Sequence, residues 1–219
     1  MTESTHVCRA CGEAAEPQGP CSRCHEGGGR SDYFAVMGLS RRLAVDLAAL
    51  EATYHRLSRE VHPDFHHAKP PAVRDDLLRR SALVNTAYRT LRDFHVRVAY
   101  LLELEGGDAL KPQAPPELLE NVIEAQDLLE RSREAPPSAQ AALAEEIRRE
   151  ADRFRDRLMG LEADLRRRAE EWDTAAGSGD DAFRGRVGRA LHDLLAQRVY
   201  LTNLIRDLEA GTPAGMSHA

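Results

Sequence analysis

The sequence has few aromatic residues and no long apolar run. Only one Trp, five Tyr and five Phe occur among its 219 residues. No apolar stretch approaches the roughly 18–20 residues that a membrane-spanning helix requires, which excludes an integral membrane protein. Hydrophobic residues still make up 42% of the chain and charged residues 30%, and the apolar positions recur at helical spacing. This combination is typical of long solvated helices rather than of β-sheet, so we predict an all-α protein.

Concentrated positive charge is also missing. The formal net charge is −6, and only Lys69 and Lys111 of the 30 basic residues are lysines. No domain-sized segment carries the basic surface that displaces counterions from nucleic acid, so we expect no nucleic-acid partner. The amino-terminal residues lack the apolar core of a secretory signal, and Glu3, Glu13 and Glu16 argue against a transit peptide. We therefore expect a cytoplasmic protein without a membrane partner.

Composition divides the chain into three parts. Residues 1–31 are poor in aliphatic side chains and end in a linker, Gly27–Gly29. The second part covers residues 32–107, and the third covers residues 115–211. A segment with two glycines at its start and two prolines at its end separates the second part from the third, which indicates that one helix ends and another begins there.

The second part predicts a helical hairpin around a polar loop. Apolar residues in its first half alternate at steps of three and four: Leu47, Leu50, Tyr54, Leu57 and Val61. Asp46 or Ser40 is expected to cap this helix, and Pro63 to end it. A loop of ten residues, HPDFHHAKPP, then leads to a second long helix. We expect a short helix over 32–39 before the hairpin and a third one over 96–104 after it.

The third part predicts three further helices. Apolar residues recur at helical spacing over 118–129, 143–172 and 183–208. A Pro-Pro pair separates the first two segments, and an Ala-Gly-Ser-Gly-Asp turn separates the last two. Because short loops between amphipathic helices imply antiparallel neighbours, we expect a C-terminal three-helix bundle.

All four cysteines lie in the first part, as two Cys-x-x-Cys pairs: Cys8 with Cys11, and Cys21 with Cys24. Two such pairs place four thiolates around one tetrahedral zinc ion, and a site with four sulfur ligands is structural because no position is left for water. A segment with so little apolar material also needs a metal to fold. We therefore predict one structural zinc ion in an N-terminal knuckle. An iron or redox role and uncoordinated thiols are the alternatives.

A His62-Pro63-Asp64 tripeptide occupies the predicted loop between the two long helices. A tripeptide alone is weak evidence, since Pro63 could simply end a helix with polar neighbours beside it. Its setting favours a function, because His55, Arg56 and Arg59 share a helix face away from the apolar residues. This face predicts a docking surface for an acidic partner. The alternative is an ordinary solvated face.

These features together resemble a J domain, the module that activates the ATPase of seventy-kilodalton heat-shock chaperones. The similarity extends to the HscB family, the J-type co-chaperones of iron–sulfur cluster assembly, whose animal members also carry a double Cys-x-x-Cys before the J domain. It is carried by four motifs: Asp32-Tyr-Phe…Gly-Leu39, His62-Pro-Asp-Phe65, Leu83-Val-Asn-x-Ala-Tyr88-x-Thr-Leu91 and Tyr100-Leu-Leu-x-Leu104.

The resemblance implies two partners. The His62-Pro63-Asp64 loop would contact the ATPase domain and linker of a HscA- or DnaK-type chaperone, and the basic helix face would steer that docking. The bundle would bind IscU, the scaffold protein that carries the nascent cluster, through its first and last helices. The matching residues here are Leu118, Leu119, Val122, Ile123 and Tyr200.

The scaffold assignment has departures and an alternative. The family has Phe before the Leu pair where this chain has Glu117, and Ile123 occupies a position where a carboxylate is expected. The alternative is that the candidate residues form ordinary bundle core. The sequence also leaves open whether the bundle self-associates.

We therefore predict a non-enzymatic adaptor that presents IscU to the chaperone while stimulating its ATPase. Such an adaptor needs no catalytic residues, because it only has to stabilise the hydrolysis-competent state of its partner. One alternative is a general J-domain co-chaperone with a different client. Another is a zinc-dependent enzyme or nucleic-acid module, which the closed four-sulfur site and the missing basic stripe disfavour.

Overall fold

The computed structural model describes residues 6–7, 14–15, 32–62, 70–106, 116–175 and 180–211. Within these ranges it contains seven helices and one pair of two-residue strands, which confirms the predicted all-α class. Contacts divide the chain into two units between Gly107 and Asp108, and each unit is described by itself. None of the described helices combines the length and the apolar character needed to span a bilayer.

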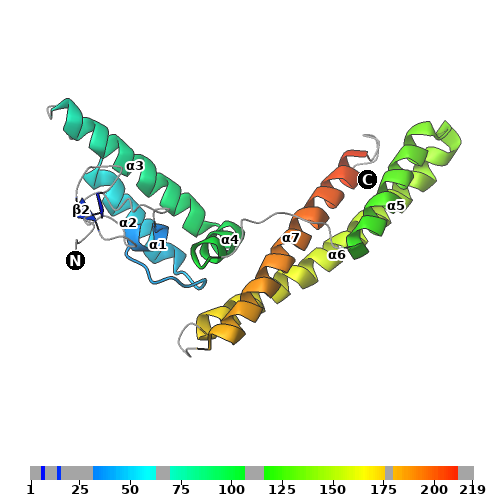
Figure 1. The fold of residues 1–219 in the computed structure, drawn as a ribbon. Helices are drawn as coiled ribbons and strands as arrows, with labels where there is room; N and C mark the ends of the chain where they lie inside the picture. Colours follow the sequence, from blue (N-terminus) through cyan, green and yellow to red (C-terminus); the bar gives the residue numbers. More distant parts are fainter. Residues whose placement is uncertain are drawn as a thin grey trace. The chain divides into compact units, whose positions relative to one another are not determined.

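The first unit begins with a short strand pair and continues with four helices. Strand β1 (His6–Val7) pairs antiparallel with β2 (Ala14–Ala15), so that Val7 lies opposite Ala14. The helices of this unit are α1 (Tyr33–Val36), α2 (Leu47–Glu60), α3 (Pro71–Arg92) and α4 (Phe94–Leu104). Helices α2 and α3 lie side by side and form the expected hairpin, and α1 and α4 both pack against α3 (Figure 1).

The ends of α2 follow from local chemistry. Of the two caps that the sequence allowed, the structure selects Asp46, whose carboxylate accepts hydrogen bonds from the N–H groups of Ala48 at 2.9 Å and Ala49 at 3.1 Å. These bonds satisfy donors that have no partner within the helix. The helix ends at Glu60, shortly before the proline at position 63. The hairpin loop therefore starts where the sequence predicts.

A buried arginine ties three segments of this unit together. Arg97 of α4 is only 5% exposed. Its Nε donates a hydrogen bond of 3.0 Å to the carbonyl of Leu43, and its Nη1 donates to the carbonyl of Leu91. Burial of a cation is tolerated only when its donors are satisfied. Arg97 thus fixes both the segment before α2 and the end of α3 to α4. The largest fully buried side chains of this unit are Phe34, Leu43, Leu50, Leu91 and Leu101.

Helix α1 is held against α4 by a tyrosine pair. The backbone N–H of Tyr33 donates a hydrogen bond of 2.9 Å to the Oη of Tyr100, and the two rings stack with centroids 4.6 Å apart. Next to this pair, Arg41 forms ion pairs with Asp32 at 2.8 Å and with Glu105 at 3.5 Å. These contacts join the beginning of the domain to its end.

The tyrosine pair predicts a loss of stability in alkaline solution. Burial raises the pKa of Tyr100 from 10.0 to about 12, against a smaller lowering by the hydrogen bond from Tyr33. Above pH 10 the unfolded chain loses this proton while the folded chain keeps it, so the free energy of unfolding should fall by about 2–3 kcal/mol as the pH approaches 12. Urea unfolding between pH 9 and about 12 measures this fall. A Tyr100→Phe protein should lack the part of this fall that comes from Tyr100. An equal fall of the unfolding free energy in both proteins would contradict the raised pKa of Tyr100.

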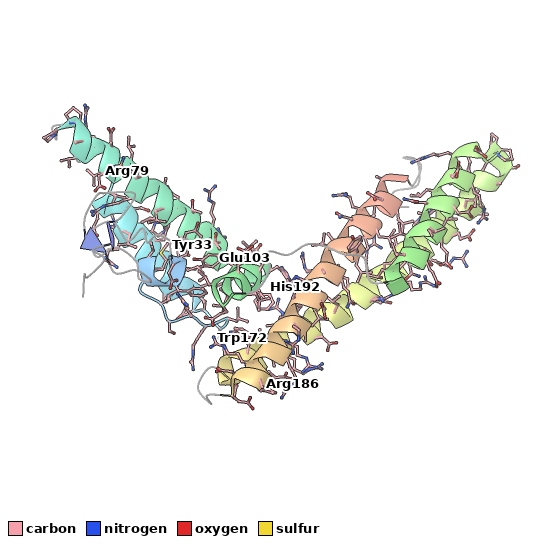
Figure 2. All side chains as sticks on the ribbon, in the orientation of Figure 1. Tyr33, Arg79, Glu103, Trp172, Arg186 and His192 are labelled. Atoms are coloured by element: carbon pink, nitrogen blue, oxygen red, sulfur yellow. The ribbon has the colours of Figure 1, made fainter. Side chains whose placement is uncertain are left out.

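The second unit is the expected three-helix bundle. It consists of α5 (Pro116–Glu134), α6 (Pro137–Ala175) and α7 (Asp181–Gly211). The long helices α6 and α7 lie side by side, and the shorter α5 packs against both (Figure 1). Trp172 is buried near the end of the α6–α7 pair that α5 does not reach (Figure 2). The largest fully buried side chains of this bundle are Leu118, Ile147, Phe154, Leu165, Leu191, Leu201 and Leu208.

Candidate functional site

The orientation of α2 is set by an aromatic contact with α3. The Tyr54 Oη–H donates a hydrogen bond of 2.8 Å to Oδ1 of Asn85, and the Tyr54 ring stacks on Tyr88 with centroids 4.2 Å apart. Leu50, on the same face of α2, is fully buried. Successive residues on a helix point about 100° apart, so His55, Arg56 and Arg59 lie off the face that holds Leu50 and Tyr54 and are exposed to solvent.

The predicted basic face is indeed exposed. His55 and Arg56 have exposed side chains, and so does Arg59. Arg56 pairs with Glu60 at 3.0 Å, while His55 lies 3.8 Å from Glu51. Exposed pairs of this kind are worth less than about 1 kcal/mol. An incoming acidic partner can therefore displace them at little cost, and the cations stay available for docking.

His62 follows directly on this face. It is exposed, and its N–H lies 3.5 Å from the carbonyl of Arg59, one turn back in α2. The other two residues of the motif, Pro63 and Asp64, lie outside the described residues. The structure thus brings His62 to the end of the basic face formed by His55, Arg56 and Arg59.

The candidate metal ligands Cys8, Cys11, Cys21 and Cys24 lie outside the described residues as well. Residues 7 and 14, which precede and follow the first Cys-x-x-Cys pair in the sequence, are paired in the β1–β2 ladder. Among the described residues no group of three His, Cys, Asp or Glu side chains could hold a metal ion.

The candidate scaffold residues divide into core and surface. Leu118 is 1% exposed and belongs to the bundle core, which corrects its assignment to a contact surface. Its neighbour Leu119 is 50% exposed, and Ile123, one turn further along α5, is 65% exposed. Val122 and Tyr200 are half-buried. The reason for the split is geometric, since adjacent residues on a helix point about 100° apart.

Val122 and Tyr200 both line a groove between α5 and α7. The groove has a volume of about 1060 Å³. It is lined by Val122, Ala125, Gln126, Leu129, Glu130, Arg133, Tyr200, Asn203, Leu204, Asp207, Ala210 and Gly211. We name this feature the α5–α7 groove, and we use "scaffold patch" for Leu119, Val122, Ile123 and Tyr200. Sequence reasoning missed most of the lining residues, although those of α7 recur at the three-to-four spacing that Tyr200 begins.

Known proteins provide an independent comparison. No family model matches the chain. A co-chaperone protein HscB homolog of Azoarcus sp. (strain BH72) is 37% identical over 109 residues, which cover 48% of this chain and only 62% of that relative, just under two thirds of its length. The HscB homolog of Bordetella avium is 34% identical over 134 residues, or 59% of this chain and 79% of that protein. The mouse iron–sulfur cluster co-chaperone protein HscB is 41% identical over 75 residues, which cover 34% of this chain and 32% of that protein.

A solved structure agrees with the fold. The crystal structure of the human co-chaperone protein HscB matches with a TM-score of 0.56 at 24% identity, covering 94% of this chain and 98% of that one. At this identity the likeness concerns the fold alone. The sequence relatives are named co-chaperones, which is a non-enzymatic class. Since the match with the Bordetella relative covers more than two thirds of that protein, the chain belongs to the HscB family of co-chaperones.

Proposed function

We propose that this protein is a cytoplasmic J-type co-chaperone of iron–sulfur cluster assembly. In this role it binds the scaffold IscU and delivers it to a HscA- or DnaK-type heat-shock chaperone while stimulating the chaperone's ATPase. The observation that carries the proposal is the exposed basic face of α2, which ends at His62 in a chain of the HscB family. The iron–sulfur cluster is cargo of the scaffold and needs no site on this chain.

Docking to the chaperone would proceed in two steps. The cations His55 (when protonated), Arg56 and Arg59 attract an acidic surface of the ATPase domain and raise the rate of productive encounters. The loop that starts at His62 then makes the specific contacts. By binding the hydrolysis-competent conformation more tightly than the resting one, the J domain shifts the chaperone toward hydrolysis. No catalytic side chain is required on this chain.

The bundle would supply the scaffold contact. The scaffold patch combines the exposed Leu119 and Ile123 with the half-buried Val122 and Tyr200. Tyrosine is enriched among the residues that anchor protein interfaces, and the apolar neighbours of Tyr200 can exclude water around it. ATP hydrolysis by the chaperone would then tighten its grip on the scaffold and promote release of the cluster.

A steady-state ATPase assay tests the proposal. The cognate chaperone is measured with this protein and with IscU, singly and together. We expect stimulation by this protein alone and greater stimulation by both, since one adaptor would bind both partners. Stimulation by the protein without binding of IscU in a pull-down would indicate a general co-chaperone with another client. No stimulation in any combination would contradict the J-domain function.

We propose in addition that the N-terminal part holds one zinc ion. The four thiols of Cys8, Cys11, Cys21 and Cys24 are a donor set that zinc favours, and the β1–β2 ladder pairs the residues on either side of the first two. When bound, the ion would supply a structural cross-link in a segment whose sequence has few aliphatic residues.

Elemental analysis of the purified protein is expected to find one zinc per chain. Replacing any one of the four cysteines by Ser should remove the metal, because three thiolates do not close a tetrahedral site. Stimulation of the chaperone should persist, since a glycine linker follows the cysteines and separates them from the helices. A matched Ser22→Ala protein should retain its zinc. Iron without zinc in protein prepared without air would contradict the assignment.

A further inference from the structure

Helix α2 carries equal numbers of permanent positive and negative charges. Its two arginines, Arg56 and Arg59, are matched by its two glutamates, Glu51 and Glu60. All four side chains are exposed, and so is His55 between them. The helix is therefore neutral when His55 is neutral, and it has a net positive charge only when His55 is protonated.

His55 lies among these charges. Its Nε2 is 3.8 Å from Oε1 of Glu51, one turn earlier, and its side chain is 61% exposed. The Nε of Arg59 donates a hydrogen bond of 3.1 Å to the His55 carbonyl. Histidine changes charge between about pH 5 and 8, whereas arginine stays charged throughout and glutamate stays ionised above about pH 5. Within this range His55 is the residue of α2 that changes the charge of the helix.

Helix α3, which packs along α2, adds cations but no histidine to this side of the hairpin. Tyr54 contacts Asn85 and Tyr88 of α3. Beside them, the Nε of Arg89 donates to the Asn85 carbonyl at 3.4 Å, and the Arg92 guanidinium lies 5.8 Å from the centroid of the Tyr88 ring. Neither arginine changes charge in this pH range. The chain after α2 contains His62, which is exposed, and then, outside the described residues, Asp64, His66, His67 and Lys69.

We propose that His55 sets the net charge of the docking surface, so that docking of the chaperone strengthens as the pH falls through the range in which histidine takes up a proton. An acidic surface on the chaperone keeps its carboxylates ionised above about pH 5, and protonation of His55 therefore adds one attraction. By reciprocity the docked chaperone favours the protonated imidazole, so docking takes up protons. This inference rests on the proposed docking to a heat-shock chaperone and adds a pH control to that same site.

A pH profile of docking by three proteins tests this proposal. The concentration that gives half-maximal stimulation of the chaperone's ATPase is measured between about pH 6 and about pH 8 for the wild type, His55→Gln and His55→Lys. From pH 8 to pH 6 it should fall about threefold more for the wild type than for His55→Gln. At pH 8 the His55→Lys protein should need about threefold less than the wild type, because lysine is still charged there. Since His62 and the loop histidines are present in all three proteins, only differences between the proteins are assigned to His55.

Two further proteins check the charge balance. Glu51→Gln removes one negative charge from the same surface, so it should lower the half-maximal concentration about threefold at pH 8. His192→Gln is the matched control, because His192 lies on α7 in the other unit, and its profile should follow the wild type. The differences between the proteins should shrink at about 1 M salt, where exposed charges are screened. All variants should keep the circular dichroism of the wild type, because the exchanged side chains lie on the surface.

The outcomes separate this inference from the proposed function. An equal change with pH in the wild type and in His55→Gln would overturn the inference and leave the co-chaperone function intact. Weaker docking of His55→Lys than of the wild type at pH 8 would do the same, because it would show that the imidazole acts by its shape. No stimulation by the wild type at any pH would overturn both. Calorimetric titration in two buffers with different ionisation enthalpies adds a second readout, in which His55→Gln should take up fewer protons on docking than the wild type. Equal uptake would contradict the role of His55.

Discussion

A His62→Gln protein is expected to lose stimulation of the chaperone's ATPase while it keeps its fold. His62 is exposed two residues after the end of α2 at Glu60, and it is not part of the buried core of its unit. Exposed loop residues contribute little to packing, so circular dichroism should be unchanged. If His62 is an anchor of the interface, its loss should weaken the functional interaction about thirtyfold, which corresponds to about 2 kcal/mol.

The same assay supplies the control. His192 lies on α7 of the bundle and is partly exposed, so a His192→Gln protein should stimulate like the wild type. Alanine at Pro63 or Asp64 should act like glutamine at His62. Stimulation by the His62→Gln protein within about twofold of the wild type would remove the assignment of this unit as a J domain.

Alanine at either of two adjacent leucines of α5 is expected to affect different properties of the protein. The substitution at Leu118 should mainly lower stability, and the one at Leu119 should mainly weaken the binding of IscU. Leu118 is 1% exposed, so Leu118→Ala leaves a cavity and should lower the free energy of unfolding by about 2–5 kcal/mol. Leu119 is 50% exposed, so Leu119→Ala should lower it by only about 0.5 kcal/mol. Binding of IscU should respond in the reverse order, with about tenfold weaker binding by Leu119→Ala. Denaturant unfolding and an IscU titration of both proteins measure the two effects.

A combined variant extends this test to the scaffold patch. Alanine at Leu119, Val122 and Tyr200 together should weaken IscU binding by well over tenfold, since hot-spot losses are about 1–3 kcal/mol per residue. Val122 and Tyr200 are half-buried, so a moderate fall of the thermal midpoint is expected. A strongly destabilised protein whose folded fraction binds IscU normally would show that these side chains serve the core.

The helices of this protein could be predicted because local signals define them. Alternating steps of three and four mark the buried face of α2, a side-chain carboxylate at Asp46 starts it, and a proline follows its end. Two adjacent prolines likewise separate α5 from α6. These signals act within a few residues along the chain. None of them depends on which helix packs against the segment. The resemblance to J-type co-chaperones was carried by equally local motifs.

The surface of the bundle could not be predicted in the same way. Leu118, Leu119, Val122 and Ile123 are all apolar, and their period marks one broad face of α5 without showing which part of it a partner helix covers. The neighbours α6 and α7 bury Leu118 and leave Leu119 and Ile123 exposed. Leu47 is another example, because it continues the apolar pattern of α2 but is 50% exposed in the first turn.

The sequence alone therefore determined the order of the helices, the basic face of α2 and the loop motif that follows it. Only the tertiary structure decided which apolar side chains are accessible, and only it joined Val122 to Tyr200 in one groove. The physical reason is that helical periodicity is a property of one segment. Burial and grooves depend on the packing of helices that are distant in the sequence, here α5 against α7.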